Sequence, residues 1–319
     1  SLSYRVVSRL KPTMTEQEYR RSFIAPSKCR DLAECLLCAT PAVKLMQSEE
    51  SLRLVVADVF EQLAADQVLY AELRFAPLLH LEQGLTAERV VATVDRAVEN
   101  CIKGSGIEAR IILCTLRHFT QEQSMETARL VERFCGTRVV GLDIAGDEAA
   151  FPLAPHKAGY EYARERGAFL TAHAGEGSGP ASVWETLREL APSRIGHGVR
   201  SAEDTKLVAL LEDRGVYLEV CPTSNVQTNI CDTLKDHPVD RLYRAGVRLS
   251  INTDSRTMTD TNLNREYRRL GEAFGWDRAE FLACNLAAIR AAFLPEEAKE
   301  RLQERMTASY SKAGAARQN

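Results

Sequence analysis

The sequence has 319 residues, 45% of them hydrophobic, and a net charge of −3 from 41 basic and 44 acidic side chains. This length suits one large α/β barrel or two ordinary domains, with enough apolar residues for a sizeable core. No segment combines a basic stripe with aromatic residues, and no apolar run reaches about 18 residues, so nucleic-acid binding and a membrane span are not expected. The first residues lack the apolar stretch of a secretory signal, and nine cysteines, several within apolar runs, indicate reduced thiols in a cytoplasmic protein.

The N-terminal region is predicted to be helical. Leu2, Val6 and Leu10 recur at helical spacing, and residues 1–20 supply no persuasive strand. The pair Cys35 and Cys38 has the spacing of a redox or zinc motif. It lies in a helical stretch, Leu32–Cys38, with no second pair at zinc spacing, which favours a structural role.

From residue 52 onward, amphipathic helices alternate with short apolar runs typical of buried strands. The predicted helices are Leu52–Leu63, Ala87–Val98, Met125–Phe134 and Glu203–Leu211. The predicted strands are Val68–Arg74, Ala109–Leu116, Val139–Ile144, Ala168–Ala172, Ser193–Ile195, Val216–Val220 and Val247–Ile251. Such alternation implies parallel strands joined by right-handed crossovers. We therefore expect a TIM-type (β/α)₈ barrel over residues 1–319, with seven strands visible and the first strand missing.

The C-terminal portion is predicted to add helices to the barrel. Asn264–Phe274, Arg278–Phe293 and Pro295–Met306 each show helical spacing. Pro295 suits the first turn of its helix, and the glutamates that follow favour the positive end of the helix dipole.

Two chemically active side chains follow the predicted strand at 168–172. His173 offers an imidazole nitrogen that can bind a metal, and Glu176 can act as an acid if burial raises its pKa. The alternative is a satisfied core histidine followed by a helix-capping glutamate. Small residues between the two permit a tight turn and close approach of a ligand.

His197 and Asp254 end two later strands. His197 is flanked by glycines, which suits an imidazole that projects into a site, although a turn with one buried histidine is equally compatible. Asp254 can ligate a metal or cap the next segment. Because the carboxyl ends of barrel strands meet at one face, His173, Glu176, His197 and Asp254 are expected to converge there.

Several other polar residues are weaker candidates. Gly146 can present a backbone N–H to a ligand, and the adjacent Asp147 and Glu148 suit either support of the site or a simple turn. Arg117 and His118 also end a strand, and a structural role is favoured for both. The remaining histidines have loop-like or helix-start contexts that predict surface or capping roles: His80, His156 and His237.

In its motifs, the chain resembles the adenosine deaminase family of metal-dependent barrels. The resemblance extends from about Ala25 to Lys299. The matching motifs are Asp143-Ile-Ala-Gly-Asp-Glu148, His173-Ala-Gly-Glu176, Gly196-His-Gly198, Glu219-Val-Cys-Pro-Thr-Ser-Asn225 and Asn252-Thr-Asp254.

The resemblance implies a role for each site residue. His173 and Asp254 would bind one zinc ion, which lowers the pKa of its bound water to about 7. Glu176 would protonate N1 of the purine, and His197 would orient or deprotonate the attacking water. Gly146 would contact N3 through its backbone N–H.

The chain departs from the family pattern at two places. Ser255 stands where the family has a second aspartate, and its hydroxyl can still donate to N7. The His-x-His of the family's first strand is absent, which leaves two protein ligands where catalytic zinc sites usually have three. Three explanations are open: a lost first strand, a degenerate member that binds nucleoside without turnover, or ligands from His118 or a neighbouring subunit.

The resemblance predicts a zinc-dependent hydrolase of purine salvage that converts adenosine or deoxyadenosine to inosine or deoxyinosine and ammonia. The alternatives are a catalytically impaired nucleoside-binding homologue and a deaminase of adenine or a modified nucleoside. The expected partner is a small purine nucleoside, with neither nucleic acid nor membrane. No sequence feature indicates an oligomeric state.

Overall fold

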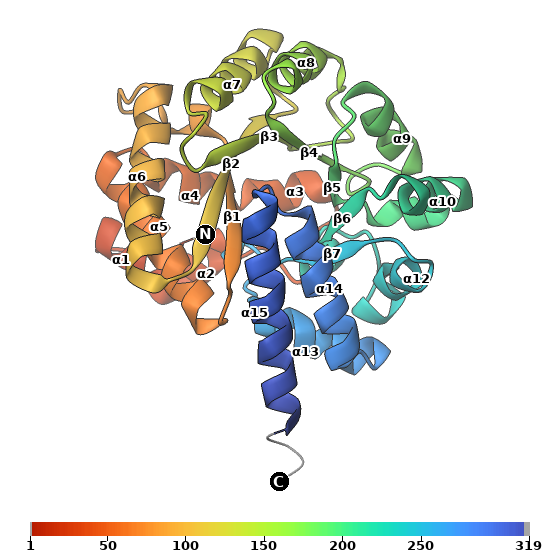
Figure 1. Ribbon diagram of the computed structural model, residues 1–319. Helices are drawn as coiled ribbons and strands as arrows, with labels where there is room; N and C mark the ends of the chain where they lie inside the picture. The colour runs from red at the N-terminus through yellow and green to blue at the C-terminus, as the bar shows by residue number, and fades with distance from the viewer. Residues whose placement is uncertain (1, 316–319) are drawn as a thin grey trace.

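The computed structural model describes residues 2–315, and its side chains as far as residue 311. Seven parallel strands lie in chain order and form one curved sheet around the centre of the molecule (Figure 1). They are β1 (Tyr70–Phe75), β2 (Glu108–Leu116), β3 (Val139–Ala145), β4 (Phe169–Ala174), β5 (Arg194–His197), β6 (Tyr217–Val220) and β7 (Leu249–Ile251). All seven predicted strands are confirmed.

Helices that follow or precede the strands form a ring around the sheet (Figure 1). They are α5 (Glu49–Ala65), α6 (Ala87–Ser105), α7 (Gln121–Arg133), α8 (Lys157–Glu165), α9 (Pro180–Glu189), α10 (Thr205–Arg214) and α12 (Val239–Arg244). Local signals set their ends. Thr120 caps α7 in a reciprocal capping box with Gln123, and α10 ends at Gly215, which adopts φ 64°.

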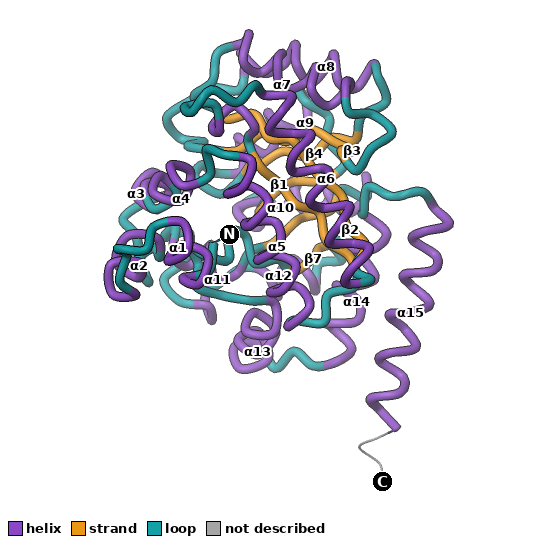
Figure 2. The backbone as a smooth tube through the Cα atoms, turned by 90° about the vertical axis from the view of Figure 1, so that its left-hand side faces the viewer, coloured by secondary structure: helices purple, strands orange, loops and turns teal. Residues whose placement is uncertain are grey.

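Two further groups of helices lie outside this ring. The N-terminal group is α1 (Tyr4–Leu10), α2 (Glu16–Phe23), α3 (Leu32–Leu37) and α4 (Thr40–Leu45), and a short α11 (Pro222–Gln227) follows β6. The C-terminal group is α13 (Leu263–Phe274), α14 (Arg278–Ala291) and α15 (Glu296–Ala315). Figure 2 shows α1 to α4 gathered on the side of the molecule opposite α15. Cys35 lies in α3 as predicted, and all nine cysteines are free thiols.

The register of the strands brings the motif residues side by side. His173 of β4 is level with Gly196 of β5, and Ala174 is level with His197. Gly196 is in turn level with Glu219 of β6. Because neighbouring parallel strands end at the same edge, residues that are far apart in the chain meet there.

The sheet does not close within residues 2–315, because β1 and β7 are its two edge strands. Between these edges lies a cavity of about 510 Å³, lined by residues of α5, β1, β7 and α14. An eighth strand of a closed barrel would occupy this place. The described residues therefore form seven of the eight strands of a TIM-type barrel, as the sequence predicts.

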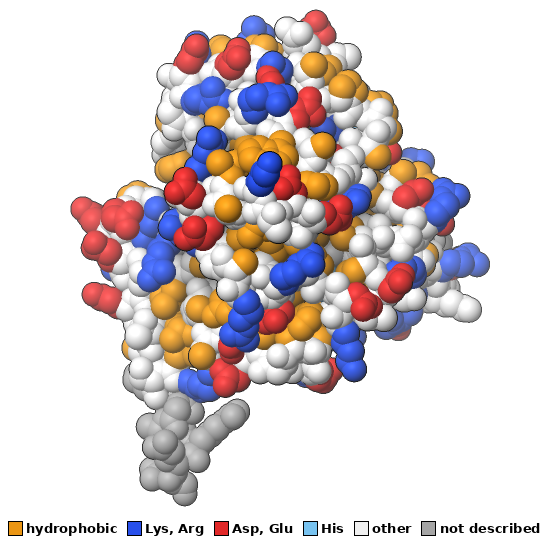
Figure 3. Space-filling view, turned by 90° about the vertical axis from the view of Figure 1, so that its right-hand side faces the viewer, with side chains coloured by type: hydrophobic (Ala, Val, Ile, Leu, Met, Phe, Trp, Pro, Cys, Tyr) orange, Lys and Arg blue, Asp and Glu red, His pale blue; other side chains and the backbone are white. Residues whose placement is uncertain are grey.

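The outer surface is polar and mixed in charge. On the face shown in Figure 3, acidic and basic side chains alternate, with small hydrophobic areas between them. Among residues 2–315, none of the helices has the length and apolar character needed to cross a bilayer.

Candidate active site

Three of the four predicted strand-end side chains lie together. The rings of His173 and His197 have centroids 5.2 Å apart, and Nε2 of His197 is 3.4 Å from Oε2 of Glu176. A ligand atom of Asp254 lies within 4.8 Å of ligand atoms of both His197 and Cys221. Asp254 therefore completes one group of four, which arises from the ends of β4, β5 and β7.

The backbone at these strand ends is strained. His197 has φ 58° and Asp254 has φ 55°, in the left-handed region that non-glycine residues rarely adopt. Gly198, with φ 68°, adjoins His197, and a Cβ atom there would lie 2.5 Å from Cδ2 of Leu218. Only glycine fits this position, and the turn it permits points the His197 ring toward Glu176.

The loop that carries Glu176 is held by a buried carboxylate. Glu148 accepts hydrogen bonds from the backbone N–H groups of Gly175 (2.7 Å), Glu176 (3.0 Å) and Ser178 (3.0 Å). The neighbouring Asp147 accepts only from the next two backbone amides within its own exposed turn. Of the two readings left open by the sequence, support of the site applies to Glu148 and a turn role to Asp147.

Glu176 is placed to act as an acid. Its carboxyl is 7% exposed, and burial raises its pKa well above the ordinary value. The negative charges of Asp254 and Glu148 raise that pKa further. The carboxyl therefore holds its proton to a higher pH than an ordinary glutamate does, which suits a proton donor.

His173 is oriented by a second buried carboxylate. Nδ1 of His173 lies 3.2 Å from Oδ1 and 3.1 Å from Oδ2 of Asp143, which is completely buried. Although burial acts to raise the pKa of Asp143, the charges of Arg74 and His173 lower it to about 2. A carboxylate on one imidazole nitrogen, with the other nitrogen turned away from it, is the usual arrangement around metal-binding histidines, although here Nε2 of His173 lies 3.4 Å from Nη1 of Arg74.

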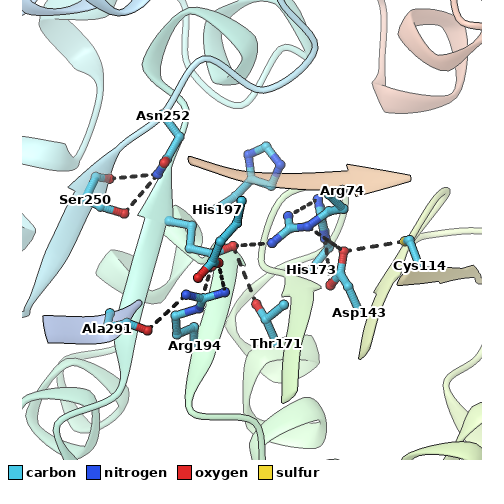
Figure 4. Close-up of polar contacts among 12 residues, drawn as sticks. Arg74, Cys114, Asp143, Thr171, His173, Arg194, His197, Ser250, Asn252 and Ala291 are labelled. Carbon is cyan, nitrogen blue, oxygen red and sulfur yellow. Dashed lines mark hydrogen bonds and ion pairs between the residues drawn. The ribbon is translucent and has the colours of Figure 1, made fainter. Parts of the chain in front are cut away.

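A network of buried charges inside the barrel was not predicted from the sequence (Figure 4). Arg74 pairs with Glu219 (2.6 Å) and with Asp143 (3.1 Å). Arg194 pairs with Glu72 (2.5 Å) and with Glu219 (2.8 Å). The signal that could have found it is the presence of charged residues within strands that are otherwise apolar, since buried charges require partners.

The residues present fit part of a zinc site. His173 and Asp254 supply an imidazole nitrogen and a carboxylate, both preferred by zinc, and Asp143 orients the imidazole. Asp254 is exposed to the cavity. Burial acts to raise its pKa, but the imidazoles of His197 and His173 lower it, which keeps the carboxylate ionised. Among the described residues, the ligand atoms that lie within 4.8 Å of one another are those of Asp254, His197 and Cys221, a group that does not include His173. Burial raises the pKa of the Cys221 thiol well above the ordinary value.

The sequence as a whole decides the family. Residues 4–309 match the family model described as adenosine deaminase. The chain belongs to the adenosine deaminase family. It is accordingly a hydrolase of the class that removes amino groups with water.

Bacterial relatives support this membership. The chain is 37% identical over 300 residues to an adenosine deaminase of Mycobacteroides abscessus, a match covering 89% of this chain and 82% of the relative. It is 40% identical over 269 residues to an adenosine deaminase of Mycobacterium tuberculosis, covering 79% of this chain and 73% of the relative.

Solved structures confirm the architecture. The adenine deaminase of Arthrobacter aurescens superimposes with a TM-score of 0.88 at 24% identity, covering 96% of this chain and 94% of that one. The Arabidopsis protein ADAL, solved with IMP, superimposes with a TM-score of 0.85 at 24% identity, covering 97% and 91%. At these identities the likeness concerns the fold.

The structure also places two further residues that the family resemblance assigned, and of these Ser255 lines the cavity that contains Asp254, whereas Gly146 lines neither cavity. Gly146 follows β3 with φ 106°, where a Cβ atom would lie 3.4 Å from the backbone nitrogen of Arg117. Ser255 follows Asp254, and both line the cavity between β1 and β7. Arg117 itself is buried and donates to the backbone carbonyl of His173 (3.2 Å), which confirms a structural role.

His118 does not supply a metal ligand within the described residues. Its ring is exposed and packs edge-on against Phe119, with centroids 4.9 Å apart, and lies 6.0 Å from the ring of Phe151. It is absent from the lining of the cavity that contains His173 and Asp254. The interpretation that His118 replaces a missing ligand is therefore wrong.

Of the surface or capping roles predicted for three histidines, the surface role is wrong, whereas the capping role holds for His237, whose Nδ1 accepts from the backbone N–H of Val239 at the start of α12. His80, His156 and His237 are all at most 4% exposed. Each ring has a hydrogen-bond partner in the interior: a carbonyl of Met46 for His80 and a carbonyl of Arg117 for Nε2 of His156. His237 bonds to Asn225, and burial lowers its pKa to about 3.

Proposed function

We propose that the protein hydrolytically deaminates adenosine or deoxyadenosine to inosine or deoxyinosine and ammonia. The observation that carries the proposal is the proximity of His173, Glu176, His197 and Asp254 to one another, with the Glu176 carboxyl buried and its pKa raised. His173, His197 and Asp254 border the cavity of about 510 Å³ between β1 and β7, part of which an eighth strand would fill.

In the proposed reaction, Glu176 donates its proton to N1 of the purine. Protonation draws electrons from the ring and makes C6 electrophilic, so that the oxygen of water adds to C6. The amino group then leaves as ammonia and a carbonyl forms at C6. His197 faces the same space as Glu176 and holds the attacking oxygen in position.

The remaining residues bind the purine and the metal. Gly146 would donate its backbone N–H to N3, and the hydroxyl of Ser255 would donate to N7. His173 and Asp254 would hold zinc, with Asp143 fixing the His173 ring. When bound, zinc acts as a Lewis acid that makes hydroxide available near neutral pH.

The charge around the site favours a neutral nucleoside over a nucleotide. Glu176 borders a second, polar cavity of about 520 Å³, whose other acidic lining residues are Asp31, Asp147 and Glu203. Its two arginines are already paired, Arg30 with Asp31 and Arg200 with Glu203. A 5′-phosphate would meet an excess of carboxylates there, which costs free energy.

A substrate panel tests this proposal. We expect loss of the adenosine absorbance band with adenosine and deoxyadenosine, and at least about tenfold lower kcat/KM with AMP and with adenine. The variant E176Q keeps the shape of the side chain but cannot donate a carboxyl proton, so turnover should fall by at least about 100-fold. Unchanged turnover in E176Q would exclude Glu176 as the acid, and preference for AMP or adenine would exclude the nucleoside assignment.

One observation favours the alternative of a nucleoside-binding protein with little turnover. Nη1 of Arg74 lies 3.4 Å from Nε2 of His173, so a fixed positive charge faces the nitrogen that would bind the metal. Metal analysis separates the two functions. Stoichiometric zinc together with deamination supports the enzyme, whereas adenosine binding without zinc and without deamination supports the binding protein.

A further inference from the structure

A buried chain of hydrogen bonds leads from the backbone to His197. The backbone nitrogen of Val239 lies 3.0 Å from Nδ1 of His237, and Nε2 of His237 lies 3.1 Å from Oδ1 of Asn225. Nδ2 of Asn225 then lies 2.9 Å from Nδ1 of His197. The side chains of His197, Asn225 and His237 are at most 3% exposed, so water does not compete with these bonds.

The direction of every bond in this chain follows from its first member. A backbone N–H can only donate, so Nδ1 of His237 must be an unprotonated acceptor and the ring proton must be on Nε2. That Nε2–H donates to Asn225, which must present its carbonyl oxygen to His237. The NH₂ group of Asn225 therefore faces His197 and donates to Nδ1.

We propose that Val239, His237 and Asn225 fix His197 in the tautomer that carries its proton on Nε2. A second proton on either ring would place N–H against N–H and remove a hydrogen bond from the buried chain. The Nε2–H of His197 points to the side of Glu176, whose Oε2 is 3.4 Å away. Asn225 and His237 are thus positioning residues that act through His197.

This tautomer decides between two roles that the sequence leaves open. With a proton on Nε2, His197 meets the attacking oxygen as a hydrogen-bond donor and orients it, and does not accept its proton. The same nitrogen has no free lone pair for a metal, which removes His197 from the group of ligand atoms that it shares with Cys221 and Asp254. The catalytic part of this inference rests on the proposed function, whereas the tautomer does not.

Nitrogen NMR of protein labelled with ¹⁵N in its histidines tests the tautomer directly. At neutral pH we expect two-bond ¹H–¹⁵N correlations to show a protonated Nε2 and an unprotonated Nδ1 for both His197 and His237. A protonated Nδ1 in either ring would overturn the proposal. This spectrum of the unmodified chain is decisive on its own, so the test does not depend on whether a variant folds.

The variant N225D is expected to reverse the tautomer of His197. A carboxylate can only accept, so Nδ1 of His197 should become the protonated nitrogen while His237 keeps its proton on Nε2. The control is N285D on α14, where the amide bonds to the hydroxyls of Tyr267 and Tyr310. N285D should leave the His197 signals unchanged. An unchanged His197 spectrum in folded N225D would contradict the proposal that Asn225 fixes the tautomer of His197.

Kinetics test the catalytic consequence. A histidine held in the wrong tautomer costs up to about 10⁴-fold in kcat in other enzymes, and we expect N225D to lower kcat by at least about 100-fold with KM changed by less than about threefold. A reversed tautomer with normal kcat would overturn the catalytic role. If the unmodified protein shows the expected tautomer but no deamination, the proposed function is wrong, whereas the proposed tautomer of His197 is confirmed.

Discussion

At the scale of single residues, Glu176 combines catalytic fitness with a cost in stability. Burial and the charges of Asp254 and Glu148 raise the pKa of its carboxyl well above the ordinary value of 4.5. Between pH 4.5 and the raised value, the folded chain holds a proton that the unfolded chain has released. Stability contributed by this group is therefore complete below pH 4.5 and falls as the pH rises through that window.

The variant E176Q is expected to be more stable than the unmodified chain at neutral pH, because glutamine has no proton to lose. In metal-free protein we expect a rise in Tm on the order of 2 °C or more at pH 7, shrinking toward zero near pH 4.5. Thermal unfolding followed by circular dichroism across this pH range measures the difference. A Tm difference that does not vary with pH would show that the pKa of the Glu176 carboxyl is not raised in the folded state.

The residue scale also shows where sequence reasoning ends. The motif residues His173, His197 and Asp254 could be predicted because each lies at or just beyond the end of an apolar run. The ion-pair partners of Arg74 and Arg194 could not be predicted. The register across the whole sheet determines which residues of different strands face one another, and the sequence pattern does not give that register. His237 does cap the start of α12 through Nδ1, but its loop context does not reveal that the ring is buried against the amide of Asn225.

At the scale of elements, the loop between β4 and α9 depends on a carboxylate from the loop after β3. Glu148 satisfies the three backbone N–H groups of Gly175, Glu176 and Ser178, and it is 8% exposed. Hydrogen bonds to a charged acceptor are among the stronger ones, and buried donors left without an acceptor are costly. The position of the loop that carries Glu176 is therefore set by a residue that precedes it in the chain.

We expect E148A to lower the free energy of unfolding by about 3 kcal/mol and to speed hydrogen exchange at the three amides that lose their acceptor. The control is D147A, which removes a carboxylate from the neighbouring exposed turn and should cost less than about 1 kcal/mol. Urea unfolding and amide exchange measure both effects. Equal costs for the two variants would contradict a special role for Glu148.

The elements themselves were well predicted, and their ends less so. Strand β4 continues to Ala174 and β5 to His197, so the motif histidines belong to the strands and do not follow them. An apolar pattern stops at the first polar side chain, whereas backbone pairing in a parallel sheet continues to the strand end. Helix α15 similarly extends to Ala315, beyond the predicted end at Met306. The polar residues of its last turns do not continue the apolar spacing from which the helix was predicted.

At the scale of the whole molecule, the sheet has two exposed edges that a closed barrel would not have. All six residues of β1 are half-buried, whereas most residues of β2 and β3 are fully buried. The apolar side chains of α5 line the cavity between β1 and β7, together with backbone that has no strand partner on that side. The seven-strand count could be predicted from the sequence, but the way the gap is lined depends on helix packing that the pattern does not encode.

The open side of the sheet predicts uneven stability across the barrel. Edge strands open more readily than central ones, because each is held by one neighbour and borders a hollow. We expect amides of β1 and β7 to exchange with solvent at least about tenfold faster than amides of β3, which is paired on both sides. Hydrogen exchange read by mass spectrometry on peptides that span 70–75, 139–145 and 249–251 measures this directly. If amides of all three strands are equally protected from exchange, the edges are covered in solution and the sheet behaves as a closed barrel. If amides of β1 and β7 exchange faster than those of β3, the region between β1 and β7 is the least stable part of the sheet, which also positions Asp254.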